Sequence, residues 1–323
     1  MRLLVAGCLL LVACSPEVPA TLPTSFYHWQ TRLAPDSSAR ALLADFACDR
    51  LYVKAFDISW GSGRLQTSAW LELDDTTGLP ELIPVVFITN SVMQQQPEVL
   101  SLAENLLQLT DELFPMGYRE LQIDCDWTAR TQVPYFSLLR AVRALRPELK
   151  LTCTVRLHQY RERQEQGIPP VERATLMAYN TGQLEDWETS NSILDTAVIV
   201  GYLSGQPPYP IPLDLGVAVF DWAAVYRRGE LTYLINEPPL VELADTSRFT
   251  RQDALRYSVR RSTYLDGLYL YEGDQLRREV APPASLAEQT ERLRRYVRYF
   301  PGQRRIVYRL GSRLWRKRPS GPK

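Results

Sequence analysis

The chain has 323 residues, 45% of them hydrophobic, and its formal net charge is zero. These values describe an ordinary globular protein and exclude a chain too short to bury a sizeable core. The charge is uneven, because 12 of the 37 Lys and Arg residues lie between Arg292 and Lys323, where no acidic residue occurs. The rest of the chain therefore carries 25 basic against 37 acidic residues.

The N-terminus has the pattern of an export signal. Arg2 precedes an apolar run, residues 3–13, that is too short to span a membrane. The stretch "LVAC" that ends at Cys14 resembles the bacterial lipobox, and this predicts lipidation of Cys14 after a signal peptide of residues 1–14. The Pro-rich residues 15–23 are expected to form a tether, and Ser15 favours the outer membrane of the cell envelope, facing the periplasm. An ordinary secretory signal is the alternative.

Three cysteines, Cys48, Cys125 and Cys153, remain after such processing. An odd number argues against a full disulfide framework even in an oxidising compartment. Because Cys125 and Cys153 alternate with large aliphatic residues, we expect both to be buried free thiols.

Eight apolar, strand-forming runs follow one another along the chain. They are residues 26–31, 51–59, 82–89, 120–128, 150–158, 174–180, 213–222 and 265–273. Helical signals fall in several of the gaps, at residues 36–47, 96–114, 134–146 and 189–203. Strands that alternate with helices pair in parallel, and eight of them predict a closed (β/α)8 TIM barrel over residues 24–282. An open doubly wound sheet is the alternative.

The end of the predicted barrel is followed by residues 283–323, for which we expect a basic, helical C-terminal extension. No Gly-rich phosphate loop follows the first strand, which argues against a nucleotide site. We expect neither a cofactor nor a metal site.

Polar residues occupy one face of the fourth and fifth predicted strands. Asp124 and Asp126 alternate with aliphatic residues on one strand, and Arg156 and His158 do so on the next. In a barrel the aliphatic face should meet the helices, so the charged face should point inward and line the mouth. Unpaired buried ions cost several kcal/mol (order of magnitude), so we expect the acids to pair with Arg156. A satisfied polar core without function is the alternative.

The stretch "IDCDWT" resembles the fourth-strand signature of family-18 glycoside hydrolases, the chitinase-like barrels, which runs Asp-x-x-Asp-x-Asp-x-Glu. Asp124 and Asp126 match its second and third acids. Leu121 replaces the first acid, and Thr128 stands where the proton-donating Glu is expected.

The stretch "MAYN" resembles the sixth-strand motif Met-x-Tyr-Asp of the same family: Tyr179 matches, and Asn180 replaces the Asp. Most of the remaining chain resembles uncharacterised bacterial lipoproteins with glycosidase-like barrels, through residues 155–160, 167–170 and 209–222.

The resemblance implies a mechanism in which the substrate's N-acetyl group attacks the anomeric carbon. Asp126 would orient that group, with Asp124 beside it, and Tyr179 would help to hold it. Thr128 cannot protonate the leaving oxygen, because a hydroxyl is too weak an acid near neutral pH. Cleavage therefore requires another acid, and the alternative is a protein that binds glycans without cutting them.

Three acids, Asp57, Asp221 and Glu272, lie near the C-terminal ends of predicted strands, where barrel active sites occur. Of these, we assign Glu272 to the catalytic residues, as the acid that replaces the one missing at position 128. Two tryptophans, Trp29 and Trp222, end predicted strands and would stack on sugar rings, whereas Trp127 should pack against helices. The residues that we expect to bind substrate are Trp29, Asp57, Arg156, His158, Asn180, Asp221 and Trp222.

The basic C-terminal segment interleaves arginines with aromatic and aliphatic residues. This pattern suits binding to anionic lipid headgroups or acidic polysaccharide, and equally suits packing against the acidic barrel. An exported lipoprotein is not expected to bind nucleic acid. The sequence thus predicts a glycoside-hydrolase-like envelope lipoprotein whose partners are a glycan and a membrane.

Overall fold

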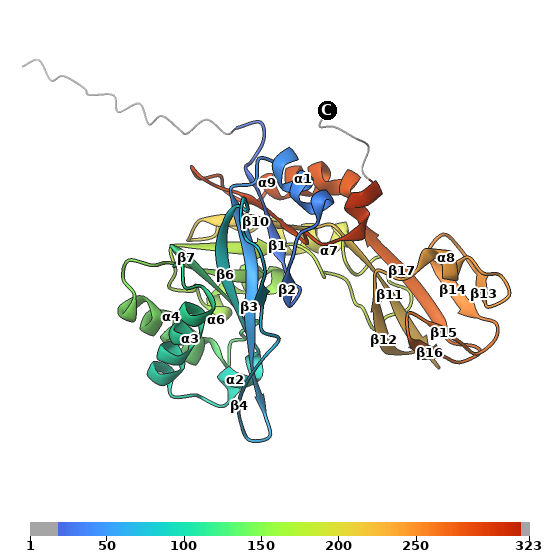
Figure 1. Ribbon diagram of the computed structural model, residues 1–323, viewed down its shortest axis with the longest axis horizontal. Helices are drawn as coiled ribbons and strands as arrows, with labels where there is room; N and C mark the ends of the chain where they lie inside the picture. The colour runs from blue at the N-terminus through green and yellow to red at the C-terminus, as the bar shows by residue number, and fades with distance from the viewer. Residues whose placement is uncertain (1–18, 318–323) are drawn as a thin grey trace, which may run out of the picture.

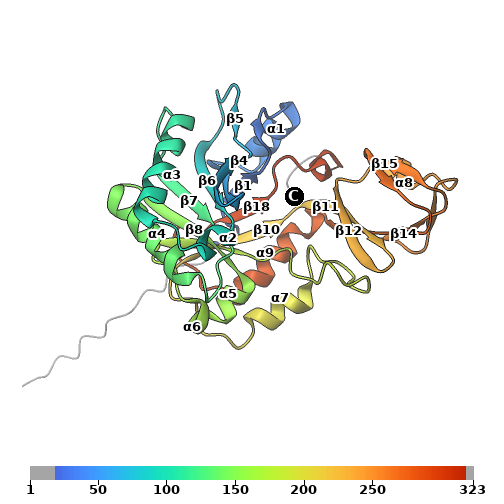
Figure 2. The same cartoon turned by 90° about the horizontal axis from the view of Figure 1, so that it is seen from below.

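The computed structural model describes residues 19–317, and eight parallel strands form a closed ring at its centre (Figures 1 and 2). Each strand pairs with the next along the chain, and the last pairs with the first, so the predicted (β/α)8 barrel is confirmed. The strands are β1 (Thr24–His28), β3 (Arg50–Gly61), β6 (Glu81–Ile88), β7 (Glu120–Asp124), β8 (Lys150–Arg156), β9 (Arg173–Met177), β10 (Leu213–Ala218) and β18 (Arg305–Tyr308).

The helices surround this ring, as the view in Figure 2 shows. Four of them match predicted segments: α1 (Ser37–Asp45), α3 (Val99–Leu113), α4 (Gln132–Leu145) and α7 (Thr196–Leu203). The others around the ring are α2 (Asn90–Gln94), α5 (Leu157–Arg161), α6 (Arg163–Gln166) and α9 (Leu286–Arg294). Side-chain carboxylates of Asp36 and Glu98 accept backbone N–H groups at the starts of α1 and α3. Within residues 19–317 no helix is long and apolar enough to cross a bilayer.

The two faces of β7 and β8 behave as their alternation predicts. Leu121, Ile123 and the following Trp127 are fully buried in the core between the strands and the helices, where Trp127 stacks on Tyr135 at 5.1 Å between ring centroids. Gln122 points the other way, into the barrel, and accepts a hydrogen bond from the Tyr27 hydroxyl at 2.6 Å. The barrel interior therefore contains hydrogen-bonded polar side chains. Cys125 and Cys153 are buried free thiols, as expected.

An antiparallel sheet is inserted between β10 and α9 and lies to one side of the barrel (Figures 1 and 2). Its strands, in spatial order, are β12 (Glu230–Asn236), β11 (Phe220–Arg227), β17 (Gln275–Ala281), β14 (Arg256–Val259) and β13 (Phe249–Arg251). The short helix α8 (Leu240–Leu243) and the hairpin of β15 (Thr263–Leu265) and β16 (Leu268–Leu270) belong to the same insert.

The predicted eighth strand, residues 265–273, is wrong, because this segment forms the β15–β16 hairpin of the insert. The closing strand is β18, which pairs with both β1 and β10 inside the segment assigned to a C-terminal extension. The barrel therefore does not end at residue 282, and the described part of the predicted extension, residues 283–317, is not a helical appendage. The four residues of β18 are flanked by arginines, so their strand signal is weak, whereas the hairpin has strong aromatic and aliphatic alternation.

The predicted seventh strand, residues 213–222, is two strands: β10 stays in the barrel and β11 leaves it for the insert. Smaller elements complete the described chain. They are β2 (Arg32–Leu33), β4 (Arg64–Ser68), β5 (Glu72–Leu73), and the 3₁₀ helices η1 (Pro283–Ser285) and η2 (Arg313–Lys317). The predicted signal peptide, Cys14 and the first residues of the tether lie outside the described residues.

Candidate functional site

A cavity of about 180 Å³ opens at the C-terminal ends of the barrel strands. Eleven residues line it: Tyr27, Trp29, Phe87, Asp124, Asp126, Thr154, Arg156, Met177, Tyr179, Asn180 and Tyr308. Six of them are sequence-predicted site residues, namely Trp29, Asp124, Asp126, Arg156, Tyr179 and Asn180. The barrel thus gathers Asp126 and Tyr179 around one hollow, hereafter called the mouth pocket.

Asp126 and Arg156 form a two-point ion pair in the mouth pocket. The Arg156 Nε donates to Asp126 Oδ1 at 2.6 Å, and a terminal nitrogen of Arg156 donates to Asp126 Oδ2 at 3.1 Å. Such a paired geometry fixes both planar groups. The side chain of Asp126 is still 44% exposed, so the pair lies at the solvated end of the pocket. The predicted pairing of the acids with Arg156 holds for Asp126.

Asp124 lies deeper and is almost completely buried. Its Oδ1 accepts a hydrogen bond from the Thr154 hydroxyl at 2.5 Å. Burial and, to a lesser extent, the charge of Asp126 raise the pKa of Asp124 to about 6, against the lowering effects of Arg156 and Thr154. The pocket therefore contains one carboxyl group that takes up a proton slightly below neutral pH.

Aromatic rings form the opposite wall of the mouth pocket. Tyr179 stacks on Tyr308 with 5.4 Å between ring centroids, and Trp29 meets Tyr308 edge-on at 6.0 Å. The Tyr179 hydroxyl is buried and has no hydrogen-bond partner in the described structure. Burial raises the pKa of Tyr179 well above its ordinary value, so this hydroxyl keeps its proton and can donate a hydrogen bond to a ligand.

The loop after β9 presents Asn180 to the pocket with a positive φ of 54°. The Asn180 N–H donates to the Ile193 carbonyl at 2.8 Å, which ties the two arms of this loop together. Next to it, Glu279 of the insert accepts the Ser192 N–H at 2.8 Å and the Trp222 indole N–H at 2.9 Å. Because Glu279 is completely buried, the inserted sheet acts as a buttress for the loop that carries Asn180.

Three predicted site residues belong to the insert and do not line the mouth pocket. Trp222 was expected to be an open platform, but it is only 9% exposed and packs edge-on against Phe220 at 5.3 Å. Asp221 is fully buried in ion pairs with Arg313, at 2.6 Å, and Arg278, at 3.4 Å. Both residues lie on β11, which leaves the barrel.

Glu272 was expected at the end of a barrel strand, and this prediction is also wrong. It lies exposed between β16 and β17, where its backbone N–H donates to the Ser262 hydroxyl at 3.0 Å. Glu272 cannot replace the missing acid of the barrel mouth, because it belongs to the insert.

Two further predicted residues flank the pocket without lining it. Asp57 forms an ion pair with Lys54 at 2.9 Å, and Lys54 lies 5.9 Å from the Trp29 ring. Asp57 is near enough to raise the pKa of Asp124. His158 is half-buried on α5, and burial lowers its pKa, so the imidazole is neutral at neutral pH.

Thr128 occupies the position of the expected general acid and is hydrogen-bonded to Thr131, the residue that precedes α4. Its backbone N–H donates to the Thr131 hydroxyl at 2.9 Å, and that hydroxyl donates to the Asn90 side-chain oxygen at 2.6 Å. Asp124 and Asp126 are the only carboxylates among the lining residues of the mouth pocket.

Five lining residues were not predicted: Tyr27, Phe87, Thr154, Met177 and Tyr308. The alternation of the first strand could have identified Tyr27, because it shares a face with Trp29. The alternation of the fifth could have identified Thr154, between Thr152 and Arg156. Tyr308 had no such signal, because the strand that carries it was not recognised.

The basic C-terminal segment packs against acids elsewhere in the chain. Arg304 binds Asp49 at 2.7 Å, and Arg309 binds Glu237 at 2.8 Å. With the Arg313 pair described above, these contacts pack the described part of the segment against both the barrel and the insert, so it is not a free basic tail.

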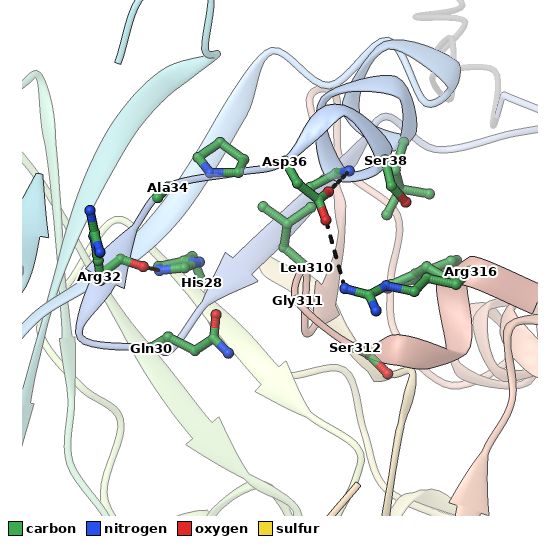
Figure 3. A pocket seen from close by; sticks show the side chains of 14 residues that line it. His28, Gln30, Arg32, Ala34, Asp36, Ser38, Leu310, Gly311, Ser312 and Arg316 are labelled. Carbon is green, nitrogen blue, oxygen red and sulfur yellow. Dashed lines mark hydrogen bonds and ion pairs between the residues drawn. The ribbon is translucent and has the colours of Figure 1, made fainter. Parts of the chain in front are cut away.

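A second cavity, of about 190 Å³, lies between α1 and η2 and contains none of the predicted site residues (Figure 3). His28 and Gln30 line one side, and His28 Nε2 lies 3.0 Å from the Arg32 carbonyl oxygen. On the other side Arg316 reaches toward Asp36 at 3.7 Å, but this carboxylate already caps α1. The only carboxylate among the described residues that line this cavity, that of Asp36, is therefore already engaged.

The solved structures that this chain resembles in fold include the following two. The Bacillus cereus spore cortex-lytic enzyme SleL has a TM-score of 0.53 and 16% identity, over 91% of this chain and 73% of that chain. A chitinase from Chromobacterium violaceum has a TM-score of 0.50 and 12% identity, over 92% of this chain and 97% of that chain. No family model and no curated protein matches the sequence. The chain therefore shares the (β/α)8 barrel fold of these two proteins, at a distance.

Proposed function

We propose that the protein binds carbohydrate in the mouth pocket and cleaves it slowly or not at all. The observation that carries this proposal is the composition of the pocket wall. Trp29 and Tyr308 offer ring surfaces for the C–H faces of a sugar, and Arg156 and Asn180 offer hydrogen bonds to its hydroxyl groups. Pockets that combine aromatic surface with a few fixed polar groups are typical of small-ligand sites.

The ligand class that the residues support best is an N-acetylated sugar. Asp126 and Tyr179 match the two residues that, in chitinase-like proteins, hold the N-acetyl group, and both line the pocket. The likeness in fold to a chitinase and a spore cortex-lytic enzyme supports the same class. The free Tyr179 hydroxyl is a donor that an acetamido oxygen would satisfy.

Slow or absent cleavage follows from the missing acid. General acid catalysis typically contributes about 10²–10⁴-fold to the rate, and Thr128 cannot supply it. Glycosidases normally use two carboxyl groups on either side of the bond that breaks. Here Asp126 is already held at two points by Arg156.

Residual hydrolysis is the second candidate, and one observation favours it. Because the pKa of Asp124 is raised to about 6, this carboxyl is partly protonated near neutral pH and could donate its proton inside the pocket. Turnover of an activated aryl glycoside of N-acetylglucosamine, lost in Asp124→Asn, would support hydrolysis. No turnover, with binding retained, would support the binding function alone.

The binding function is tested by calorimetric titration with soluble chitooligosaccharides. Tyr179→Phe removes the free hydroxyl in the pocket and should weaken binding several-fold, in the range of one hydrogen bond. Tyr209→Phe is the matched control, because its hydroxyl is also buried and unpartnered but lines a different cavity. Equal effects of the two variants, or no binding by the unaltered protein, would contradict the proposal.

The lipobox motif at Cys14 supports a location in the bacterial cell envelope, with the outer membrane as the membrane concerned. Under this proposal the lipid anchor is the main membrane contact. The described part of the basic segment contributes less, since Arg304, Arg309 and Arg313 are already paired with acids.

A further inference from the structure

The insert presents a ladder of tyrosines to solvent. Tyr264, Tyr269 and Tyr271 are 61%, 41% and 52% exposed. Their rings meet edge-to-face, at 5.0 Å between Tyr264 and Tyr269 and at 5.1 Å between Tyr269 and Tyr271. Of the large side chains that are exposed in residues 19–317, every tyrosine belongs to the insert. We call these three residues the tyrosine platform.

The sequence builds the platform by simple alternation. Tyr264 pairs directly with Tyr269 across the β15–β16 hairpin, so both rings lie on the same face. Leu265 and Leu270 point to the other face, where they are fully buried in the core of the insert. The two-residue turn Asp266-Gly267 has positive φ at both positions, as a tight hairpin requires.

Two arginines hold the platform rigidly in place. Arg227 lies over the Tyr271 ring at 4.3 Å and binds the buried Asp274 through two hydrogen bonds, of 3.0 and 2.9 Å. Asp274 also accepts the Tyr271 backbone N–H at 2.8 Å. At the other end, Arg248 donates to the Thr263 hydroxyl at 2.9 Å and to the Tyr264 carbonyl.

We propose that the tyrosine platform is a second carbohydrate-binding surface, which holds an uncharged polysaccharide while the mouth pocket takes a few of its sugar units. Solvent-facing positions of a hairpin are normally polar, and a fixed aromatic surface there marks a binding site. Tyrosine combines a flat apolar ring with a hydroxyl, which matches the mixed apolar and hydroxylated surface of a sugar chain. Arg227 is neutralised by Asp274, so it gives no preference for an acidic polymer.

This inference rests on the proposed function, and its test separates the two. Co-sedimentation with insoluble chitin measures polymer binding, and titration with a short chitooligosaccharide measures pocket binding. The double variant Tyr264→Ser, Tyr269→Ser should weaken polymer binding at least about tenfold, because binding at two linked sites is lost, and should leave oligosaccharide binding unchanged. Tyr233→Ser is the matched control, since Tyr233 is an exposed tyrosine of the same insert that lies on β12, outside the ladder.

Each outcome decides between the sites. Polymer binding that is unchanged in the double variant but weakened by Tyr179→Phe would overturn the platform and leave the pocket standing. Polymer binding that depends on the platform alone would support the platform and count against the pocket. If the double variant loses a protein partner and keeps the polymer, the platform is a protein-docking surface and the inference is wrong. Near-ultraviolet circular dichroism, unchanged in both serine variants, shows that the insert stays folded.

Discussion

The buried carboxyl group of Asp124 gives the sharpest test of the site's electrostatics. Replacing it by Asn keeps the shape and the acceptor oxygen for the Thr154 hydroxyl, which lies 2.5 Å away. The change removes only the ability to carry a negative charge in a buried position. We therefore expect Asp124→Asn to stabilise the protein at neutral and alkaline pH.

The sign and size follow from the pKa. The folded protein holds the Asp124 pKa at about 6, above the ordinary value of 3.8 that applies to the unfolded chain. Between these values the folded state binds a proton that the unfolded state does not, so stability falls as the pH rises through this window. Above pH 6 the ionised carboxyl costs about 3 kcal/mol, an order-of-magnitude figure that the Asn variant avoids.

Urea unfolding at pH 4.5, 6.0 and 7.5 measures this difference. The gap between the variant and the unaltered protein should be small at the lowest pH and largest at the highest. Asp214 also has a pKa raised to about 6, but it is present in both proteins and cancels in the comparison. Asp266→Asn, on the exposed hairpin turn, is the control and should show no such gap. A variant that is equally stable at every pH would refute the assignment of a buried, ionised Asp124.

Three further predictions concern other parts of the chain. Glu279→Gln should lower the free energy of unfolding by about 3–5 kcal/mol, because Arg277, 2.6 Å away, becomes a buried unpaired charge. An unchanged melting temperature would contradict the supporting role assigned to Glu279. A chain that ends at residue 282 should give no cooperative unfolding transition in circular dichroism, because it lacks the closing strand; a folded fragment would show that β18 is dispensable. Cys14→Ser should abolish labelling by radioactive palmitate and release the protein from the membrane fraction, whereas retained label would exclude the lipobox.

The sequence was informative where a strand had a long and regular alternation of apolar and polar residues. On β7 and β8 the alternation of aliphatic and polar residues identified the inward-facing side, and this placed Asp124, Asp126 and Arg156 in one pocket. Helix positions also followed from their apolar spacing, as in α3 and α4. Both patterns arise from local geometry, which a single sequence records.

The sequence was misleading where two segments could each have formed the eighth strand of the barrel. The hairpin of β15 and β16 has stronger strand signals than β18, yet only β18 can pair with both β1 and β10. That choice depends on contacts far apart in the chain, which propensity does not record. The error at Glu272 follows from this competition between the two segments, whereas Asp221 and Trp222 were misplaced because the predicted seventh strand continues into β11 of the insert.

The position of the closing strand also determines when the barrel can close during synthesis. Thr24 pairs with Arg305, so the first strand waits for nearly the whole polypeptide before it finds one of its two neighbours. Until then the edges of β1 and β10 are open and can pair with strands of other molecules. Pairing over such a separation is slow. Nascent chains therefore need protection from aggregation until synthesis has passed residue 308.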